Sequence, residues 1–505
     1  MATEDLFPLT YYLDVAWRNI GSASLDLDLP DVIGYADITA RWPEFRQNIL
    51  TKYANEDYLP LSVEKVDLPK DRISVRPLAR LDLEHRLVYE ALVSAIAPEI
   101  GRLTSRAVYS SRWWTRKQRM LSPVSSWINM QKAAKRFHLA HKNYYLARAD
   151  ISSFFEHVDV DIMADDLRQL NAERWAVGAL ERFLRSFSTL SSAWGIPQGP
   201  EMSGILANLY LMPLDSELRR SGFTHFRYSD DMYIFGKDWT ALRQVLVAAN
   251  KTLRHRHLNL AASKTEIIDS ASILQHLEDR VKDSISYGVN VGMEGVEGDL
   301  HDLFDTATDP DEPNARDLKF CLTNLAEMKD DYAVDWVLDN ILKIPHVARE
   351  ALLYLSSFTE KRPGSMGVVV NFLRDEQMSI YPYAQSHVLI FMMRNNVKGQ
   401  HAADAAWRIL LDRNAEGFLR EMAARYLGLT ARPGESARLK QEYQVEPDRR
   451  VRRALLVACY ESKQCSDEWL QHVARSDPSL SVTAEYLRSG PVFIPYPSVE
   501  RPEWR

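Results

Sequence analysis

The chain has 505 residues, of which 46% are hydrophobic and 26% charged, and its formal net charge is −7. This length is too great for one hydrophobic core, so we expect two or three domains. The composition excludes a low-complexity chain, and no apolar run is long enough to cross a bilayer. The three cysteines lack paired metal-ligand spacing. The first ten residues lack a basic segment followed by an apolar one, so we expect no signal peptide and a cytoplasmic location.

The first seventy residues are acidic and contain no recognisable chemistry. Residues 13–20 predict a short helix, and residues 25–30 alternate strictly between apolar and polar side chains. The proline and the acids of that second segment weaken the prediction of a strand. We expect residues 1–70 to form an N-terminal extension that packs on the domain after it.

An amphipathic helix is predicted over residues 82–100, after the short segment 75–80. It places Leu83, Leu87 and Ile96 mostly along one broad side. From residue 101 to residue 149 the chain then contains no Asp or Glu.

This acid-free tract reverses the expectation drawn from the net charge, which by itself argues against a nucleic-acid partner. Its basic residues are interleaved with aromatic residues, a pattern typical of proteins that bind single-stranded or heteroduplex nucleic acid. The residues we expect to bind nucleic acid are Arg116, Lys117, Arg119, Trp113 and Trp114. The alternative is a solvated surface whose cations pair with acids elsewhere.

Three carboxylates lie at the ends of predicted strands. Residues 144–151 predict a strand that ends in Asp150, and residues 226–235 predict two short strands joined at Asp230 and Asp231. Adjacent carboxylates repel each other, more strongly in a dry setting, so they need water or a cation. Two such strand ends would bind divalent ions roughly 3.5–4 Å apart, the arrangement that drives in-line phosphoryl transfer. Mg²⁺ suits such a site; a solvated Asp–Asp turn is the alternative for the hairpin alone.

Two further segments accompany the acids. Residues 195–200, Gly-Ile-Pro-Gln-Gly-Pro, predict a rigid turn whose glycines allow a ligand to approach the backbone closely. A helix-like run follows at residues 203–211, and Lys264 lies beyond a short apolar segment after the hairpin.

In this order and spacing, Asp150, the segment 195–200, the Tyr-Ser-Asp-Asp box at 228–231 and Lys264 resemble the palm of the reverse transcriptases. The resemblance implies an α+β right-hand polymerase with fingers and palm over residues 71–270. It also implies an RNA-directed DNA polymerase that adds dNTPs with two Mg²⁺ ions. The extension 1–70 would then pack on the fingers.

The resemblance assigns the catalytic and metal-binding residues. Asp150, Asp230 and the carbonyl of Ile151 would hold the ions, with Asp231 in a supporting place. Lys264 would protonate or neutralise the leaving pyrophosphate.

Other residues would contact the nucleotide or the template. Guanidinium groups match phosphate geometry, so two arginines would clamp the triphosphate, with surface pairing as the alternative. The ring of Phe155, beneath the sugar, would exclude a 2′-hydroxyl. Phe154, its neighbour, would then be part of the core. The backbone at 195–200 would support the templating base and the primer end. The residues concerned are Arg76, Arg112, Phe155, Gln198 and Gly199.

After residue 270 the pattern changes. We interpret residues 271–314 as a thumb remnant and linker, because an amphipathic helix precedes a Gly- and Asp-rich passage. Residues 315–505 are helical in pattern, and a phrase of apolar, charged and small residues returns at 345–355, 417–427, 448–456 and 478–487. Such degenerate repeats indicate an all-α HEAT-like solenoid, with an irregular helical bundle as the alternative.

The sequence of residues 315–505 contains no Cys/His cluster and no second acidic constellation resembling RNase H. A polymerase followed directly by helical repeats is similar to the bacterial abortive-infection and defence-associated reverse transcriptases. That resemblance implies antiphage defence, priming from a protein hydroxyl or an associated noncoding RNA, an RNA template and a DNA product. A homo-oligomer through the helical-repeat domain is one option, and no membrane partner is expected. Two alternatives stay open: a template-independent DNA nucleotidyltransferase on the same palm, and an inactive RNA-binding scaffold.

Overall fold

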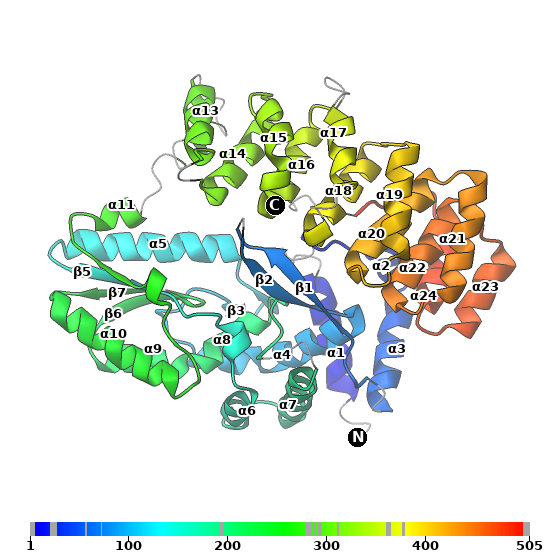
Figure 1. The fold of residues 1–505 in the computed structure, drawn as a ribbon. Coiled ribbons are helices and arrows are strands. Elements are labelled where there is room, and N and C mark those ends of the chain that lie inside the picture. The colour runs from blue at the N-terminus through cyan, green and yellow to red at the C-terminus, as the bar shows by residue number, and fades with distance from the viewer. Residues whose placement is uncertain are drawn as a thin grey trace. The chain divides into compact units, whose positions relative to one another are not determined.

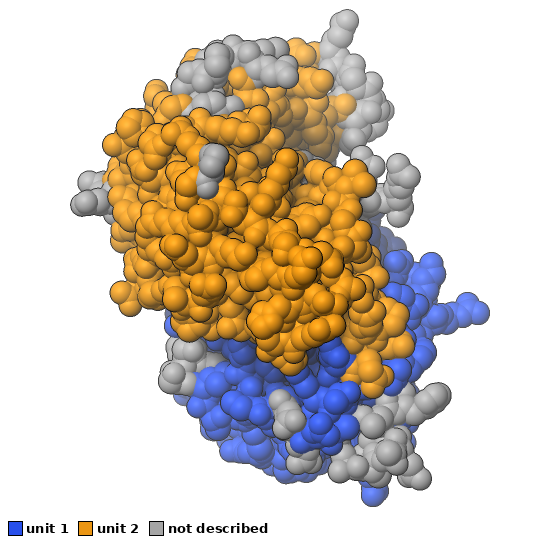
Figure 2. Space-filling view, turned by 90° about the vertical axis from the view of Figure 1, so that its right-hand side faces the viewer, with its two compact units in different colours: residues 1–23, 48–65, 78–280 blue, residues 24–47, 66–77, 281–505 orange. Residues whose placement is uncertain are grey.

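The computed structural model describes residues 6–20, 28–55, 58–71, 73–190, 195–277, 282, 285–286, 289, 295–310, 313–359, 365–375 and 379–497. The chain forms two compact units (Figure 2): unit 1 contains residues 1–23, 48–65 and 78–280, and unit 2 contains residues 24–47, 66–77 and 281–505. Within the described ranges, no helix combines the length and the apolar character that a membrane crossing requires.

Unit 1 is a mixed α/β unit (Figure 1). Its helices are α1 (Leu6–Ile20), α4 (Leu83–Leu103), α5 (Pro123–Ala140), α6 (Val160–Arg168), α7 (Arg174–Ser188), α8 (Ser203–Tyr210), α9 (Met212–Arg220), α10 (Trp239–Arg254) and α11 (Ile273–Leu277). Its strands are β3 (Trp113–Trp114), β4 (Arg119–Met120), β5 (Tyr145–Ala149), β6 (Thr224–Tyr228), β7 (Asp231–Gly236) and β8 (Glu266–Ile268). The boundary between the units passes through α3 (Trp42–Ala54), β1 (Val63–Pro69) and β2 (Val75–Leu81).

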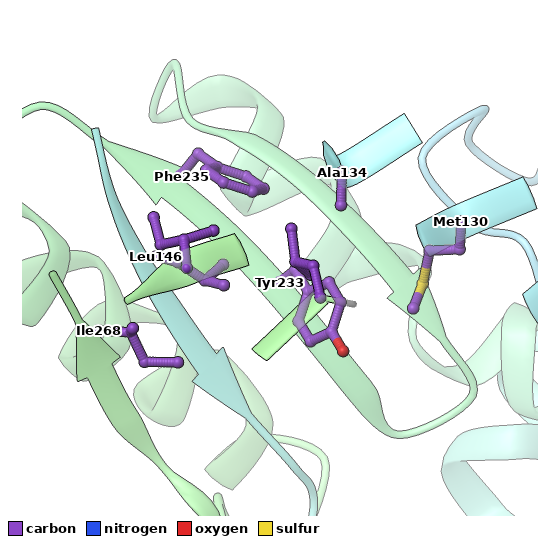
Figure 3. Close-up of a cluster of buried hydrophobic side chains, with 8 residues drawn as sticks. Met130, Ala134, Leu146, Tyr233, Phe235 and Ile268 are labelled. Atoms are coloured by element: carbon purple, nitrogen blue, oxygen red, sulfur yellow. The ribbon is translucent and has the colours of Figure 1, made fainter. Parts of the chain in front are cut away.

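An antiparallel four-stranded sheet in the order β6-β7-β5-β8 forms the centre of unit 1. Helix α10 packs against β5, β7 and β8, and α9 packs against β6. On the other face, α5 and α11 close a core of buried side chains, several of which are seen in Figure 3: Met130, Ala134, Leu146, Tyr233, Phe235, Ile268, Ile273 and Leu277. Both faces of the sheet therefore carry helices.

Helix α4 is more deeply buried than its predicted single apolar side implies. The polar residues His85, Glu90 and Ser94 are buried together with its apolar ones, because α1, α7 and α8 all pack against α4. The prediction of a helix there is confirmed, but the prediction of one buried side is wrong.

In the described residues of unit 2, the regular secondary structure is helical apart from its parts of the β1–β2 hairpin. Its helices are α2 (Ala36–Ala40), α13 (Val296–Ala307), α14 (Ala315–Met328), α15 (Val334–Asn340), α16 (Ala348–Ser356), α17 (Ser365–Phe372), α18 (Pro382–Arg394), α19 (Gln400–Leu411), α20 (Gly417–Thr430), α21 (Pro433–Val445), α22 (Arg449–Glu461), α23 (Asp467–Ser476) and α24 (Ser481–Arg488). Two 3₁₀ helices, Ile341–Lys343 and Pro345–Val347, join α15 to α16.

Alternate helices of unit 2 contact one another in succession. The contacts run from α14 to α16, α18, α20, α22 and α24, while α13, α17, α19, α21 and α23 each pack against the helix that follows them. At Gly428 of α20, an added Cβ would lie 2.4 Å from the Ala458 Cα of α22, so only glycine permits this close approach. The four repeated phrases of the sequence all fall within this succession, on α16, α20, α22 and α24.

The N-terminal segment is divided between the units, which differs from the single extension predicted over residues 1–70. Residues 24–47 belong to unit 2, where α2 contacts α24. The physical reason is charge: Arg453 donates to Asp31 at 2.5 Å and to Asp37 at 2.8 Å. The alternating segment 25–30 is described only from residue 28, so most of that strand prediction lies outside the described residues.

The predicted thumb remnant and linker, residues 271–314, does not form one unit. Its described parts are α11 in unit 1 and α13 in unit 2. Most of the passage between residues 278 and 294 lies outside the described residues.

Candidate active site

The three predicted carboxylates come together at one end of the four-stranded sheet. Strands β5 and β7 are antiparallel with Ala149 opposite Met232, so Asp150 and Asp231 lie just beyond and at the end of paired strands. Asp230 is in the turn between β6 and β7, where Tyr228 pairs with Asp231. The strand–turn–strand prediction for this stretch is confirmed.

Lys264 lies against the first of these acids. The Ala261 amide donates to the Asp150 carbonyl at 2.8 Å, and Ile151 forms a bridge with Leu260. These backbone contacts bring the 3₁₀ helix Ala262–Lys264 beside the site, where Lys264 Nζ forms an ion pair with Asp150 Oδ2. The Ile151 side chain is buried.

The site holds more negative than positive charge. Burial raises the pKa of Asp230, and the charge of Asp150 raises it further. Burial, with Asp230 and Asp150 next in effect, raises the pKa of Asp231 to about 6. Lys264 and Arg148 act in the opposite direction on Asp231 without cancelling this rise. Both carboxylates would therefore be stabilised by a further cation.

The structure does not place these acids as a complete ligand set. Within the described ranges, no group of three or more His, Cys, Asp or Glu side chains is arranged to hold a metal ion. The donor chemistry still fits a hard divalent cation, since the two acids of raised pKa are half-buried oxygen donors beside the buried Asp150.

A buried network holds the turn that carries Asp230. Ser229 has φ 57°, in the left-handed region that few non-glycine residues adopt. Its amide donates to Ser110 Oγ at 2.7 Å, and its carbonyl accepts from Arg227 Nη1 at 2.9 Å. These two bonds fix the conformation of Ser229 and hence the position of the next residue, Asp230.

Arg227 is itself fixed from the opposite side. Its guanidinium donates twice to Asp215, at 2.9 Å and 2.6 Å, and once to Asn208 at 3.2 Å. Burial would raise the pKa of Asp215, but the charge and hydrogen bonds of Arg227 outweigh burial and lower it. Asn208 also donates to the Ser110 carbonyl at 2.9 Å, which closes the network.

The segment 195–200 lies against the predicted steric gate. The Ile196 amide donates to the Phe155 carbonyl at 3.1 Å. Gly195 has φ +70°, and an added Cβ there would lie 2.0 Å from that same carbonyl oxygen. Only glycine fits this approach. Phe154 is buried as core, whereas the ring of Phe155 is partly exposed, which leaves Phe155 as the candidate gate.

Gln198 and Gly199 are held by β2. The Ala79 amide donates to the Gln198 carbonyl at 2.8 Å, and Gly199 packs against Leu78 and the Ala79 carbonyl. The Gln198 side chain is partly exposed.

The two predicted triphosphate clamps are placed differently. Arg112 is partly buried and donates to the carbonyls of Ser105 at 2.8 Å and Thr104 at 3.3 Å. Burial lowers the pKa of Arg112. Its guanidinium is thus engaged with backbone in this structure. Arg76 is exposed on the part of β2 that belongs to unit 2, apart from the unit that contains the carboxylates.

The predicted nucleic-acid residues form the small β3–β4 hairpin, in which Trp113 pairs with Met120 and Trp114 with Arg119. Lys117 Nζ lies 4.5 Å from the centre of the Trp114 ring, and the Arg119 guanidinium carbon lies 5.6 Å from it. The buried Trp113 Nε1 has no hydrogen-bond partner among the described residues. Arg116 is exposed.

Comparison with known proteins bears on this geometry. Residues 68–287 match the family model described as reverse transcriptase (RNA-dependent DNA polymerase). Residues 68–287 are a reverse transcriptase domain. The domain gives the chain its enzyme class, a nucleotidyltransferase that acts as an RNA-directed DNA polymerase, and reverse transcriptases use divalent metal ions. The match ends before α13, and α13 to α24 of unit 2 lie outside it.

Other comparisons are distant. No curated protein matches the chain. Telomerase from Candida albicans, solved with the TWJ fragment of telomeric RNA, is 11% identical with a TM-score of 0.31, over 79% of this chain and 70% of that chain. Telomerase from Candida tropicalis with the same kind of fragment is 10% identical with a TM-score of 0.30, over 76% and 67%. Likenesses at this level carry no argument about this reverse transcriptase domain.

Sequence reasoning missed the residues that support the reverse transcriptase site. Arg148 shares a strand face with Asp150 and lowers the pKa of Asp231, and alternation along the strand was a signal that could have found it. Arg227 was visible only as a charged residue within a strand. Its partners Asp215, Asn208 and Ser110 are too distant in sequence to show a pattern.

Proposed function

We propose that the chain synthesises DNA with two Mg²⁺ ions held by Asp150, Asp230 and Asp231, with the Ile151 carbonyl as a further ligand. The observation that carries this proposal is the grouping of three carboxylates at the strand ends. Burial and the charges of their neighbours raise the pKa of Asp230, and they raise the pKa of Asp231 to about 6. Bound Mg²⁺ would lower the pKa of the attacking hydroxyl and neutralise charge on the leaving phosphates.

The chain's own residues prepare this reaction. The network of Arg227 and Ser110 holds the Ser229 turn and so positions Asp230. Lys264, paired with Asp150, is a cation beside the acids and is the residue we assign to the leaving pyrophosphate.

We assign the substrate as a deoxynucleotide, because the partly exposed Phe155 ring is held through its backbone by Ile196. Phe155→Val should raise ribonucleotide use relative to deoxynucleotide use by roughly tenfold to a few hundredfold. Single-turnover incorporation of matched dNTP and NTP measures this ratio, and Phe154→Val, a change in the core, is the comparison variant. An unchanged ratio in Phe155→Val would move the gate elsewhere. Arg76, Arg112, Gln198 and Gly199 remain assigned to the triphosphate and the template.

The nucleic-acid partners are an RNA template or an associated noncoding RNA, and the DNA product. Arg116, Lys117, Arg119, Trp113 and Trp114 of the β3–β4 hairpin are assigned to contact them. Unit 2 is assigned as a HEAT-like repeat, which is supported by the succession of contacts between alternate helices. The biological role assigned is antiphage defence, with priming from a protein hydroxyl or an associated RNA.

The catalytic assignment is tested by DNA synthesis with purified chain, a DNA primer on an RNA template, dNTPs and Mg²⁺. Asp150→Asn and Asp230→Asn should each lower incorporation by on the order of a thousandfold or more, because each removes a ligand from the site of transition-state charge. Asp339→Asn changes an exposed acid of α15 and should keep wild-type activity. Added Mg²⁺ should also raise the melting temperature of the wild type more than that of Asp230→Asn. Wild-type incorporation by both site variants would overturn the assignment.

Sequencing the product separates this function from the second candidate, an untemplated DNA nucleotidyltransferase. A product complementary to the supplied RNA supports templated synthesis, and a product independent of it supports the alternative.

A further inference from the structure

Helix α5 extends along the sheet from the turn between β6 and β7 that carries Asp230, here called the catalytic turn because of the proposed function. The Tyr228 hydroxyl donates to the Pro123 carbonyl at 3.0 Å, and the Trp127 ring meets the Tyr228 ring edge-on with centroids 5.1 Å apart. One turn further along, Gln131 Nε2 donates to the Tyr233 hydroxyl at 3.1 Å. Tyr228 and Tyr233 flank Asp230 and Asp231 in the sequence, so the first turns of α5 lie beside the carboxylates. Figure 3 shows Tyr233 together with Met130 of α5.

The helix covers the sheet face that α9 and α10 leave open. Its buried residues Ser126, Met130, Ala134 and His138 recur every four positions and face the core. A nucleic-acid strand that leaves the carboxylates on this side therefore meets the outer surface of α5 and not the sheet.

That outer surface is cationic and partly apolar. Val124, Ile128 and Leu139 are 53%, 43% and 46% exposed. Lys132 and Arg136 are also exposed, and the helix belongs to the tract 101–149 that contains no Asp or Glu. The surface therefore suits a polyanion that also offers flat apolar groups.

An open cavity of about 620 Å³ lies on this surface, here called the α5 cavity. It is lined by Tyr109, Asn129, Lys132, Lys135, Arg136 and Leu139. Tyr109 comes from the segment beside β6, where its amide donates to the Arg227 carbonyl at 2.9 Å. The cavity thus joins three cations to an aromatic ring whose backbone is tied to the strand that carries the catalytic turn.

The β3–β4 hairpin is less available for base stacking than its sequence predicts. Lys117 and Arg119 already lie near the Trp114 ring, and the indole nitrogen of Trp113 is buried. The α5 cavity has its ring and its cations on the same open surface.

We propose that the α5 cavity binds a nucleic-acid strand that runs from the catalytic carboxylates along α5. This inference rests on the proposed polymerase function, because it names where the substrate strand lies. Lys132, Lys135 and Arg136 contact phosphates, Tyr109 and Leu139 contact a base or sugar, and Asn129 lies between them. At 1.5 Å per residue, Lys132 is about 14 Å along α5 from Pro123, which spans about four base steps.

The first test measures binding without catalysis. The probe is a fluorescent oligo(dT) or oligo(U) in EDTA, with full-length Asp230→Asn protein, so no result depends on incorporation. Replacing Lys132, Lys135 and Arg136 together by Gln should lower the slope of log affinity against log salt by about 2, which is up to about a hundredfold in affinity at 0.1 M salt. The matched control replaces Lys251, Lys343 and Lys398, three exposed cations elsewhere, by Gln and should change neither value.

A second pair of variants tests the cavity itself and avoids wholesale loss of charge. Asn129 is exposed on α5, so both Asn129→Glu and Asn129→Gln should fold. Asn129→Glu should weaken oligonucleotide binding at least tenfold, and Asn129→Gln should leave it within twofold. A photoreactive 4-thiouridine oligonucleotide should crosslink to the peptide that contains Tyr109 or α5.

Several outcomes overturn the inference. One is an equal loss of oligonucleotide affinity in the cavity and control triple variants. Another is crosslinking confined to the β3–β4 hairpin. A third is binding of poly-glutamate as tight as that of the oligonucleotide, which would assign the cavity to an acidic protein segment. Failure of the polymerase function is seen separately, as absence of incorporation by the wild type whose oligonucleotide binding persists.

Discussion

Two pairs of carboxylates in this chain, one buried and one half-buried, have opposite electrostatic outcomes. In unit 2, Asp31 and Asp37 share the guanidinium of Arg453, and Thr483 donates to Asp37 at 2.6 Å. Burial would raise the pKa of Asp31, but Arg453 and the amides of Tyr35 and Ile33 outweigh burial and lower it. At the catalytic turn, by contrast, the pKa values of Asp230 and Asp231 are both raised.

The difference lies in how far each pair of acids is compensated within the chain. Acids that fasten a segment are compensated within the chain, by a cation and by backbone amides. The acids of the β6–β7 turn are not compensated in this way, since Lys264 and Arg148 do not cancel the rise in the pKa of Asp231. Clustered carboxylates are therefore informative only together with the count of cations and donors around them.

The largest effect should come from removing the compensation in unit 2. Arg453→Met leaves Asp31 and Asp37 buried without their cation and should lower the free energy of unfolding by about 3–5 kcal/mol. Arg452→Met is the matched control on the same helix, since Arg452 forms a partly exposed pair with Asp477 at 2.7 Å and should cost about 1 kcal/mol or less. Urea unfolding followed by circular dichroism measures both. Equal losses of unfolding free energy in the two variants would mean that the Arg453 cluster contributes no more to stability than a partly exposed ion pair.

At the catalytic turn, removing a charge should raise the free energy of unfolding instead of lowering it. Asp231→Asn removes a carboxylate whose pKa is about 6 in the folded protein and 3.8 as a free group. The folded wild type binds more protons between these values, so its stability falls as pH rises from about 4 to about 6. In metal-free protein at pH 7.5, Asp231→Asn should raise the free energy of unfolding by about 1–2 kcal/mol. This is less than the pKa difference multiplied by about 1.36 kcal/mol per unit, because the group is partly solvated.

Thermal unfolding in EDTA at pH 7.5 and at pH 4 checks this prediction. The gain should be present at the higher pH and absent at the lower one. A loss of stability in Asp231→Asn at pH 7.5 would place the acid among the compensated clusters.

The smallest expected effect is on the pH dependence of stability, and it comes from a buried histidine of unit 2. His387 in α18 faces the Asp28 carbonyl at 3.0 Å, and burial, followed by the charge of Arg349, lowers its pKa to about 3. The unfolded chain takes up this proton near pH 6.5 and the folded chain does not, so stability falls as pH drops from about 6.5 towards 3. The groups around it are Asp28, Arg349, Lys319 and Tyr383.

His387→Gln keeps a donor for the Asp28 carbonyl and should flatten the pH dependence of stability by at most about 1.4 kcal/mol per pH unit below pH 6.5. The measurement is the difference between wild type and variant across pH 4.5–7.5, in which other titrating groups cancel. An unchanged slope would show that the ring is protonated in the folded protein.

The sequence predicted the reverse transcriptase domain and its acids because their signals are local. A strand that ends in an acid, a Gly-Ile-Pro-Gln-Gly-Pro turn and a hairpin with two acids each occupy about ten consecutive residues or fewer. Periodicity also located α4 and four helices of unit 2, although it misjudged how much of α4 is buried. HEAT-like repetition, the defence role and the individual site roles stay predictions.

What the sequence did not predict depends on partners far apart in the chain. Arg453 and Asp31 are 422 residues apart, and Ser110 and Ser229 are 119 apart. No window of periodicity spans such distances, so both the place of residues 28–47 and the support of the catalytic turn were missed. Helix α5 was missed for a different reason. Residues 101–149 were interpreted by their charge, and the four-residue spacing of the buried residues of α5 was not considered.

The ion pair between Asp31 and Arg453 also sets an order of events during synthesis. The acid leaves the ribosome 422 residues before its arginine, which at typical elongation rates is roughly 20–80 s. Throughout that interval two carboxylates destined for burial have no cation. Residues 28–47 can therefore take their final place only after Arg453 has left the ribosome, whereas the segments before and after them belong to unit 1. A ribosome stalled before residue 453 would hold a polymerase whose chain is still open at this segment.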